Sequence, residues 1–217
     1  MRAHLHFSAC RRRNPLLRDS SRACTLKRAP RLAGTLAAML LIHVGCRRAE
    51  PLQVFNTVPG FTLTAQSGQP LVSMRELAGN VWIADFIYTS CPGPCPRLSR
   101  QMKQIQTALE SEKDVRLVSF TIDPKNDTPD QLAAYAKRYA ADTTRWFFLT
   151  GDPEVLQKLC LETFMLGTIS GNLDHSTRFV LVDRQSRVRK YYESTDSGVV
   201  SSLIDDARSL LHASPDS

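Results

Sequence analysis

Two cysteines, Cys91 and Cys95, lie four positions apart in the segment CPGPCP at residues 91–96. If the second cysteine begins a helix, the two thiols lie roughly 5 to 6 Å or less apart, which suits one shared metal ion or a disulfide. A helix N-terminus favours thiolates, which bind metals and carry out redox chemistry. Two apolar cysteines that merely pack together are the alternative, but the prolines and glycine that fix this loop favour a functional pair. The segment therefore predicts a metal site or a redox-active dithiol.

Two apolar runs flank the cysteine segment and indicate the elements that position it. Residues 81–88 and 115–122 are rich in apolar, β-branched and aromatic side chains, as is typical of buried parallel strands. Between them, one face of a helix is indicated by apolar residues at steps of four, three and four: Leu98, Met102, Ile105 and Leu109. These runs predict a βαβ unit in which the cysteines lie where the first strand ends and the helix starts.

The remaining pattern completes an α/β fold. A hairpin at 61–72 precedes a short helix with a Ser73/Glu76 capping box, and a later helix begins with a Thr128/Gln131 capping box. The other predicted elements are a strand at 146–149, a helix at 152–164, a hairpin of strands 179–183 and 188–193, and a helix at 199–211. This order predicts a thioredoxin-like α/β fold, with a central mixed sheet and helices on both faces.

A histidine stands close to the predicted strand at 179–183. In a thioredoxin-like sheet, the segment that enters this strand lies against the dithiol loop, so that the imidazole of His175 can reach the two sulfurs. The folded part contains one other histidine, His212, near the C-terminus. A lone histidine is more often structural than a ligand, but its place opposite a thiol pair favours a ligand here.

The chain resembles the Sco (SenC) family of copper proteins of respiratory membranes over about residues 55–195. The matching segments are TSCPGPCP at 89–96, TIDPKNDTP at 121–129, WFFLTG at 146–151 and DHSTRF at 174–179. The resemblance implies that Cys91, Cys95 and His175 are copper ligands. The chain departs from the family at Gly93 and Pro94, where an acidic and an aliphatic residue are usual, and in a shorter loop before His175.

The resemblance implies a copper-binding accessory protein for the dinuclear copper centre of cytochrome c oxidase, with subunit II or a similar protein as the copper acceptor. Two thiolates and an imidazole suit Cu(I), and with a fourth ligand they hold Cu(II); zinc accepts the same donors. The alternative is an extracytoplasmic thiol-disulfide oxidoreductase that cycles Cys91 and Cys95 and does not need His175. A peroxidase fits the fold, but its usual motifs are missing from this sequence.

Three further residues bear on the site. Asp123 and Asp127 follow the strand at 115–122, where they would cap the next helix, fix the loop or form an outer shell around the metal. We favour the capping interpretation on sequence grounds. Cys160 lies among apolar neighbours and is predicted to pack in the core.

Charge is concentrated in the N-terminal part of the chain. Residues 1–46 hold nine of the 28 basic residues and one of the 21 acidic ones, so the remainder is nearly neutral. That balance argues against a nucleic-acid partner. The apolar run at 32–44 is shorter than the roughly 20 residues of a spanning helix, and it fits a secretory signal.

Gly45 and Cys46 close this apolar run like a lipobox, in which the cysteine is lipidated. We therefore predict a leader at 1–46, a tether at 47–59, the thioredoxin-like domain at 60–212 and a tail at 213–217. The leader would anchor the domain at the outer, periplasmic face of the cytoplasmic membrane. Two alternatives remain open, an uncleaved anchor and an organelle transit peptide that leads to the mitochondrial inner membrane, facing the intermembrane space.

Overall fold

The structure, a computed structural model, describes residues 52–167 and 176–213. Within these residues eight strands form one mixed sheet in the order β1-β8-β7-β4-β5-β6-β2-β3. The strands are β1 Asn56–Thr57, β2 Thr62–Ala65, β3 Pro70–Val72, β4 Val81–Ile87, β5 Val115–Thr121, β6 Trp146–Thr150, β7 Arg178–Val182 and β8 Arg187–Glu193. Strands β4, β5 and β6 are parallel to one another, whereas β7 runs antiparallel to β4.

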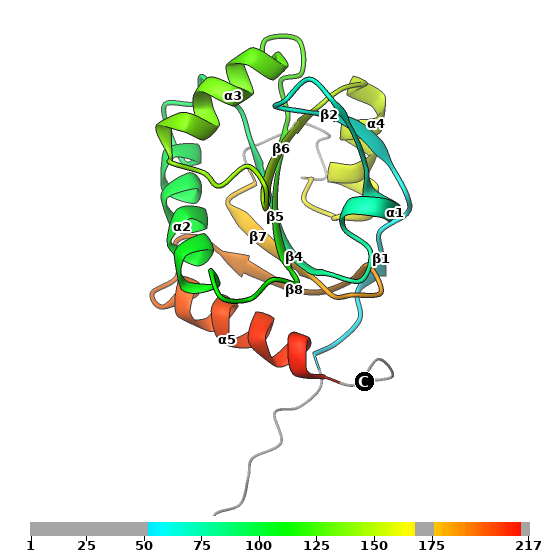
Figure 1. Cartoon of the computed structure of the whole chain (residues 1–217), viewed down its shortest axis with the longest axis vertical. Coiled ribbons are helices and arrows are strands. Elements are labelled where there is room, and N and C mark those ends of the chain that lie inside the picture. Colours follow the sequence, from blue (N-terminus) through cyan, green and yellow to red (C-terminus); the bar gives the residue numbers. More distant parts are fainter. Residues whose placement is uncertain (1–51, 168–175, 214–217) are drawn as a thin grey trace, which may run out of the picture. The chain divides into compact units, whose positions relative to one another are not determined.

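Helices cover both faces of this sheet (Figure 1). Figure 1 shows α2, α3 and α5 on one face, and α1 and α4 on the other. The helices are α1 Ser73–Glu76, α2 Cys95–Ala108, α3 Pro129–Arg138, α4 Pro153–Lys158, the π-helix η1 Leu159–Thr163 and α5 Val199–His212. The predicted thioredoxin-like arrangement is thus confirmed. Among the described residues, no helix combines the length and apolar character needed to cross a bilayer.

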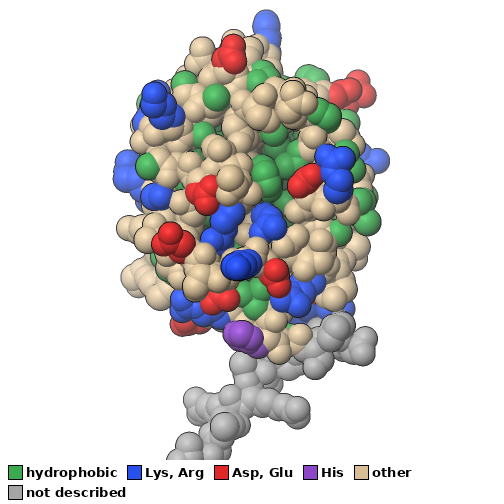
Figure 2. All heavy atoms as spheres, in the orientation of Figure 1, with side chains coloured by type: hydrophobic (Ala, Val, Ile, Leu, Met, Phe, Trp, Pro, Cys, Tyr) green, Lys and Arg blue, Asp and Glu red, His purple; other side chains and the backbone are tan. Residues whose placement is uncertain are grey.

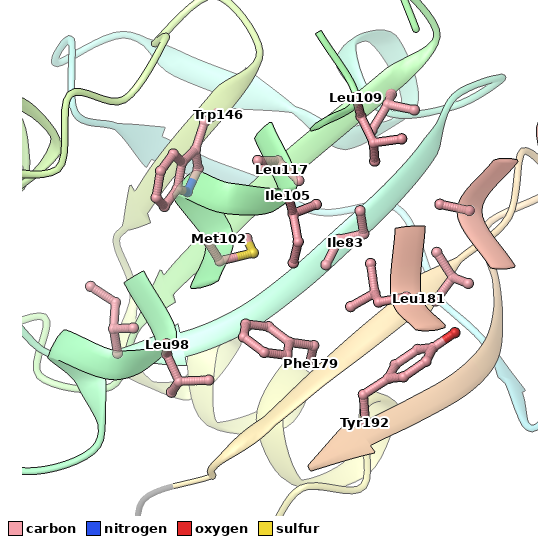
Figure 3. Packing of buried hydrophobic residues seen from close by; sticks show 14 of the residues in the cluster. Ile83, Leu98, Met102, Ile105, Leu109, Leu117, Trp146, Phe179, Leu181 and Tyr192 are labelled. Atoms are coloured by element: carbon pink, nitrogen blue, oxygen red, sulfur yellow. The ribbon is translucent and has the colours of Figure 1, made fainter. Parts of the chain in front are cut away.

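Strand β4 lies at the centre of two hydrophobic clusters. Its seven residues are all buried because both of its faces are covered. Side chains alternate along the strand, so Ile83 and Ile87 belong to the cluster under α2, whereas Trp82 belongs to the cluster on the other face. Figure 3 shows Ile83 beside Met102 and Ile105 of α2. The largely apolar run at 81–88 therefore reflects burial on both faces.

Of the two predicted helix caps, the one at Thr128 is present and the one at Ser73 is wrong. Thr128 accepts a hydrogen bond from the backbone N–H of Gln131 (3.4 Å), as predicted. The side chain of Asp152 likewise caps α4. The hydroxyl of Ser73 instead accepts from the backbone N–H of Phe61 (2.8 Å), and no side chain caps α1. Ser73 therefore joins the opening hairpin to α1, a long-range contact that the local capping pattern conceals.

Part of the predicted tether at 47–59 is folded onto the sheet. Residues Asn56–Thr57 form β1, which pairs antiparallel with β8. The buried guanidinium of Arg189 donates to the carbonyl oxygen of Leu52 (3.0 Å) and pairs with the carboxylate of Asp183 (2.8 Å). The folded part therefore includes residues 52–59, because a cation buried far along the chain fixes their backbone.

Surface charges of both signs are mixed on the face shown in Figure 2. Several basic side chains form ion pairs, among them Arg184 with Asp114 (3.2 Å) and Lys190 with Asp206 (2.6 Å). These partly exposed pairs contribute little to stability. The mixture leaves no extended basic area on this face, in keeping with the near-neutral charge of residues 47–217.

A carboxylate interrupts the apolar centre of β4. Asp85 is fully buried, and its Oδ1 accepts a hydrogen bond from the hydroxyl of Ser119 (2.6 Å). The same hydroxyl accepts from the indole N–H of Trp146 (2.9 Å). Oδ2 of Asp85 has no hydrogen-bond partner among the described residues. Burial raises the pKa of Asp85 to about 7, although the bond from Ser119 acts in the opposite direction.

Replacing Asp85 with asparagine should change how stability depends on pH. Between its ordinary pKa of 3.8 and about 7, the carboxyl group binds more protons in the folded than in the unfolded protein. Its contribution to stability is therefore present at low pH and lost as the pH rises through that window. We expect the free energy of unfolding of the wild type to fall relative to that of Asp85→Asn from about pH 4 to 7. The slope is at most about 1.4 kcal/mol per pH unit, measurable by urea unfolding.

Asp183→Asn is the matched control. Burial acts to raise the pKa of Asp183, but hydrogen bonds from Arg189 and Arg187 outweigh it and lower the pKa. Its stabilising contribution is present at neutral pH and lost as the pH falls through the lowered value, so the trend is opposite in sign. Parallel pH profiles for the wild type and Asp85→Asn would contradict the raised pKa of Asp85.

Candidate functional site

Cys91 and Cys95 lie where β4 leaves the sheet and α2 begins. β4 ends at Ile87, and α2 starts at Cys95 itself, with Pro94 as its N-cap residue. Both thiols are buried in the cluster between the sheet and α2. The carbonyl oxygen of Pro94 accepts hydrogen bonds from the backbone N–H groups of Arg97 (2.9 Å) and Leu98 (3.1 Å). The proline-rich loop therefore leads directly into the helix, and the predicted position of Cys95 in its first turn is confirmed.

The two thiols differ in acidity. Burial acts to raise the pKa of Cys91, but hydrogen bonds from Cys95, from the backbone N–H of Gly93 and from the hydroxyl of Tyr88 outweigh it and lower the pKa. Burial raises the pKa of Cys95 to about 12, and the hydrogen bond to Cys91 and the charges of Cys91 and Asp85 add to this. The predicted effect of the helix start thus holds for Cys91 and is wrong for Cys95, where burial dominates.

A buried carboxylate fastens the start of the cysteine loop. Asp127 accepts hydrogen bonds from the backbone N–H of Thr89 (3.2 Å), the hydroxyl of Thr89 (2.5 Å) and the hydroxyl of Thr121 (2.5 Å). Thr89 follows β4 and Thr121 ends β5, so Asp127 holds the ends of two neighbouring strands together. The capping interpretation of Asp127 is wrong, because Thr128 caps α3 and Asp127 fixes the loop.

Asp123 closes the turn between β5 and α3. Its carboxylate accepts a hydrogen bond from the side-chain amide of Asn126 (2.8 Å). Its carbonyl oxygen accepts from the backbone N–H groups of Asn126 (3.1 Å) and Asp127 (2.9 Å). Capping of α3 by Asp123 is therefore also wrong. The turn that it stabilises delivers Asp127 to the end of β5.

Sequence reasoning missed Tyr88 and Thr121 as parts of this site. Tyr88 lies just before the cysteine loop, and its hydrogen bond to Cys91 raises its own pKa. Thr121 lies in the quoted segment TIDPKNDTP, but only the parallel pairing of β4 with β5 brings it next to the cysteine loop. Thr121 thus acquires its role through the pairing of distant segments, whereas Tyr88 acts on a thiol only three residues away.

His175 lies outside the described residues, so its part in the site stays a prediction. The topology of the described residues bears on it. β7 begins at Arg178 and runs antiparallel to β4, with Trp82 opposite Val182 and Ala84 opposite Val180. The chain therefore enters β7 at the end of the sheet where β4 leaves it. Within residues 52–167 and 176–213, no three potential ligands among His, Cys, Asp and Glu are grouped closely enough for a metal ion.

Cys160 belongs to the other face of the sheet. It lies in η1 within the cluster that contains Trp82, whereas Cys91 and Cys95 belong to the cluster that contains Ile83. Burial raises the pKa of the Cys160 thiol to about 11. The prediction that Cys160 packs in the core is confirmed. All three cysteines of the described part are free thiols.

Comparison with known proteins shows similarity to one family along most of the chain. The SCO1/SenC family model matches residues 49–212. The SCO1 protein homolog of Bacillus subtilis (strain 168) is 33% identical over 183 residues, which cover 82% of this chain and 93% of the relative.

Two solved structures are similar to this chain over about three quarters of its length. A SCO1/SenC family lipoprotein from Bacillus anthracis str. Ames is 32% identical, with a TM-score of 0.66 and coverage of 76% of this chain and 99% of that one. BsSco, described as a Sco-family cytochrome c oxidase assembly protein with a disulfide switch, is 31% identical, with a TM-score of 0.65 and coverage of 76% and 100%. Since the family model spans the folded part and these relatives align over nearly their whole length, the chain belongs to the SCO1/SenC family.

Proposed function

We propose that this protein is a copper-binding accessory protein, which supplies copper to the dinuclear copper centre of cytochrome c oxidase, with subunit II or a similar protein as the acceptor. In this proposal Cys91, Cys95 and His175 bind one copper ion as cargo. The observation that carries it is the pair of thiols at the start of α2, at the end of the sheet where the chain following His175 enters β7. Membership in a family that includes a cytochrome c oxidase assembly protein supports the acceptor.

The donor set favours copper among the common metals. Two thiolates and one imidazole are soft to intermediate donors, which suit Cu(I) in three-fold coordination. A structural zinc site usually has four protein ligands. Among the described residues, no other His, Cys, Asp or Glu is grouped with Cys91 and Cys95, so none of them supplies the fourth ligand. Cu(II) would be accepted with a fourth ligand such as water.

Thiol-disulfide exchange is the second candidate, and the unequal acidity of the two thiols favours it. A thiol of lowered pKa is the better attacking group near neutral pH, so Cys91 would attack and Cys95 would close the disulfide. The disulfide switch described for BsSco belongs to the same chemistry. A dithiol that binds copper can also reduce a disulfide, so the two activities are compatible on one site.

We infer that the leader at residues 1–46 keeps the domain at the outer face of a membrane, through a lipid on Cys46. The support is the apolar run that ends at Gly45-Cys46, together with a relative from Bacillus anthracis described as a lipoprotein. Cys46 lies outside the described residues. An extracytoplasmic position agrees with the proposed acceptor, which would receive copper on that side.

Alkylation should distinguish the three thiols of the folded, reduced protein. We expect Cys91 to react with iodoacetamide near pH 7 at least several-fold faster than Cys95 and Cys160, because only Cys91 has a lowered pKa. Peptide mapping after timed quenching measures the three rates. In urea the three rates should become similar, and labelling of Cys95 or Cys160 as fast as Cys91 in the folded protein would contradict the assignment.

Replacing His175 with alanine separates the two candidate functions. Loss of an imidazole ligand should weaken Cu(II) binding by 100-fold or more, since losing even an outer-shell partner typically costs about 10- to 100-fold. The Cys91–Cys95 disulfide should still form and be reduced by dithiothreitol. Copper content, Cu(II) absorption and oxidase activity of membranes from a strain that carries the variant are the measurements.

His212→Ala is the matched control, because His212 is exposed at the end of α5. It should leave copper binding and oxidase maturation unchanged. If His175→Ala retains one tightly bound copper ion and supports full oxidase maturation, the copper proposal fails. Thiol-disulfide exchange would then become the main function.

Replacing Cys46 with serine tests the anchor. The wild type should fractionate with membranes and carry a lipid on Cys46 by mass spectrometry, whereas Cys46→Ser should carry no lipid and lose its membrane attachment. Cys24→Ser, a change within the same leader, should behave as the wild type. A membrane-bound Cys46→Ser protein, together with an unmodified Cys46 in the wild type, would replace the lipid with an uncleaved anchor.

A further inference from the structure

Asp85 lies beneath the first turns of α2. Side chains alternate along β4, so Asp85 projects from the same face as Ile83 and Ile87. These two isoleucines share one buried cluster with Cys91 and Cys95. Figure 3 shows Ile83 of this face next to α2. A carboxylate therefore lies on the face of the sheet that packs against α2 and the two thiols.

No positive group neutralises this carboxylate within the described residues. Each ion pair found there involves another acidic residue, and one side-chain hydrogen bond reaches the Asp85 carboxylate, from the hydroxyl of Ser119 (2.6 Å). Oδ2 is buried and has no hydrogen-bond partner in the part of the chain that the structure describes. An unpaired carboxylate is costly to bury, and apolar or amide side chains of similar size fit such positions better. Stability of the fold alone therefore does not explain why an aspartate occupies position 85.

The field of Asp85 reaches the thiol site. Its negative charge contributes to the raised pKa of Cys95 and to that of Tyr135. Tyr135 lies on α3, and its hydroxyl hydrogen-bonds with the hydroxyl of Ser99 on α2 (2.9 Å). Asp85 thus acts on groups of two helices that cover this face. Because little water screens charges in a buried cluster, such interactions are stronger than at the surface.

The charge of a metal complex decides how it responds to a nearby anion. Two thiolates and a neutral imidazole give a net charge of −1 with Cu(I) and of zero with Cu(II). A fixed negative charge repels the first complex and not the second. Adding one electron to bound Cu(II) therefore becomes less favourable when a carboxylate lies nearby.

We propose that Asp85 determines which oxidation state of copper the site prefers, by strengthening Cu(II) binding relative to Cu(I) through its buried negative charge. This inference rests on the proposed copper-binding function. Asp85 is not a ligand in it. Asp85 acts on the bound ion through its charge, which also affects Cys95. In this proposal the three ligands select the metal, and Asp85 selects its oxidation state.

The test is the ratio of Cu(II) to Cu(I) dissociation constants in Asp85→Asn, measured on the reduced protein at pH 8. That pH lies above the pKa of about 7, so the wild-type carboxylate is charged. We expect the ratio to rise about tenfold, the size of a unit-charge interaction across about 12 Å of protein at an effective dielectric constant near 20. A tenfold change corresponds to a rise of about 59 mV in the Cu(II)/Cu(I) potential.

Competition with chromophoric chelators gives both constants. Cu(I) is titrated without oxygen, and Cu(II) is measured by rapid mixing, with free thiols counted afterwards because Cu(II) can oxidise the dithiol. Asp85→Leu is the second neutral variant, and it should shift the ratio in the same direction. Asp183→Asn is the control, since Asp183 follows β7 at the end remote from the thiols and is already paired with Arg189. It should leave the ratio unchanged.

The outcomes separate this inference from the proposed function. If the wild type binds copper tightly and both neutral variants keep the wild-type ratio within about twofold, the inference is wrong and the proposed function stands. If the wild type binds neither oxidation state, both fail. A rise in both Asp85 variants, with none in Asp183→Asn, supports the inference, because a general loss of packing would weaken both oxidation states alike.

Discussion

The hydrogen bonds accepted by Asp127 are the constraint on which the arrangement of the site depends. This carboxylate joins Thr89, just after β4, to Thr121, at the end of β5. Neighbouring parallel strands bring their carboxyl ends to the same end of the sheet, but this pairing does not determine how the chain leaves that end. Asp127 determines it for β4. The loop that follows can then cross the end of the sheet and place Cys95 at the start of α2.

Three buried aspartates illustrate three ways to hold a carboxylate out of water. Asp127 accepts hydrogen bonds from hydroxyl and backbone groups, and Asp183 pairs with Arg189 and Arg187. Both arrangements compensate for the lost hydration. Among the described residues, Asp85 has one side-chain hydrogen bond, no cation and an unpartnered Oδ2. Among the three buried aspartates of the described part, Asp127 and Asp183 are thus compensated, whereas Asp85, on the face that carries the thiols, is not.

Local sequence patterns predicted the elements well and the contacts between them poorly. The apolar runs at 81–88 and 115–122 identify buried strands because both faces of each strand are covered, and periodicity alone reveals the helix that follows Cys95. The local pattern predicts a capping role for Ser73, a tether at residues 47–59 and a lowered pKa for the Cys95 thiol. Each of these depends on a partner distant along the chain: Phe61, the strand β8 or the core around α2. The family motifs identified the cysteines, since their spacing is local.

The pairing of β1 with β8 shortens the free linker that precedes the folded domain. Arg189 holds the carbonyl of Leu52, and β1 then runs along β8 as far as Thr57. These six residues would span up to roughly 20 Å if extended freely, and that slack is lost. If the chain is anchored upstream of Leu52, as proposed, the attachment acts on the edge strand β1 of the sheet. It then limits both how far the thiol end of the sheet can travel and the directions in which that end can face a partner.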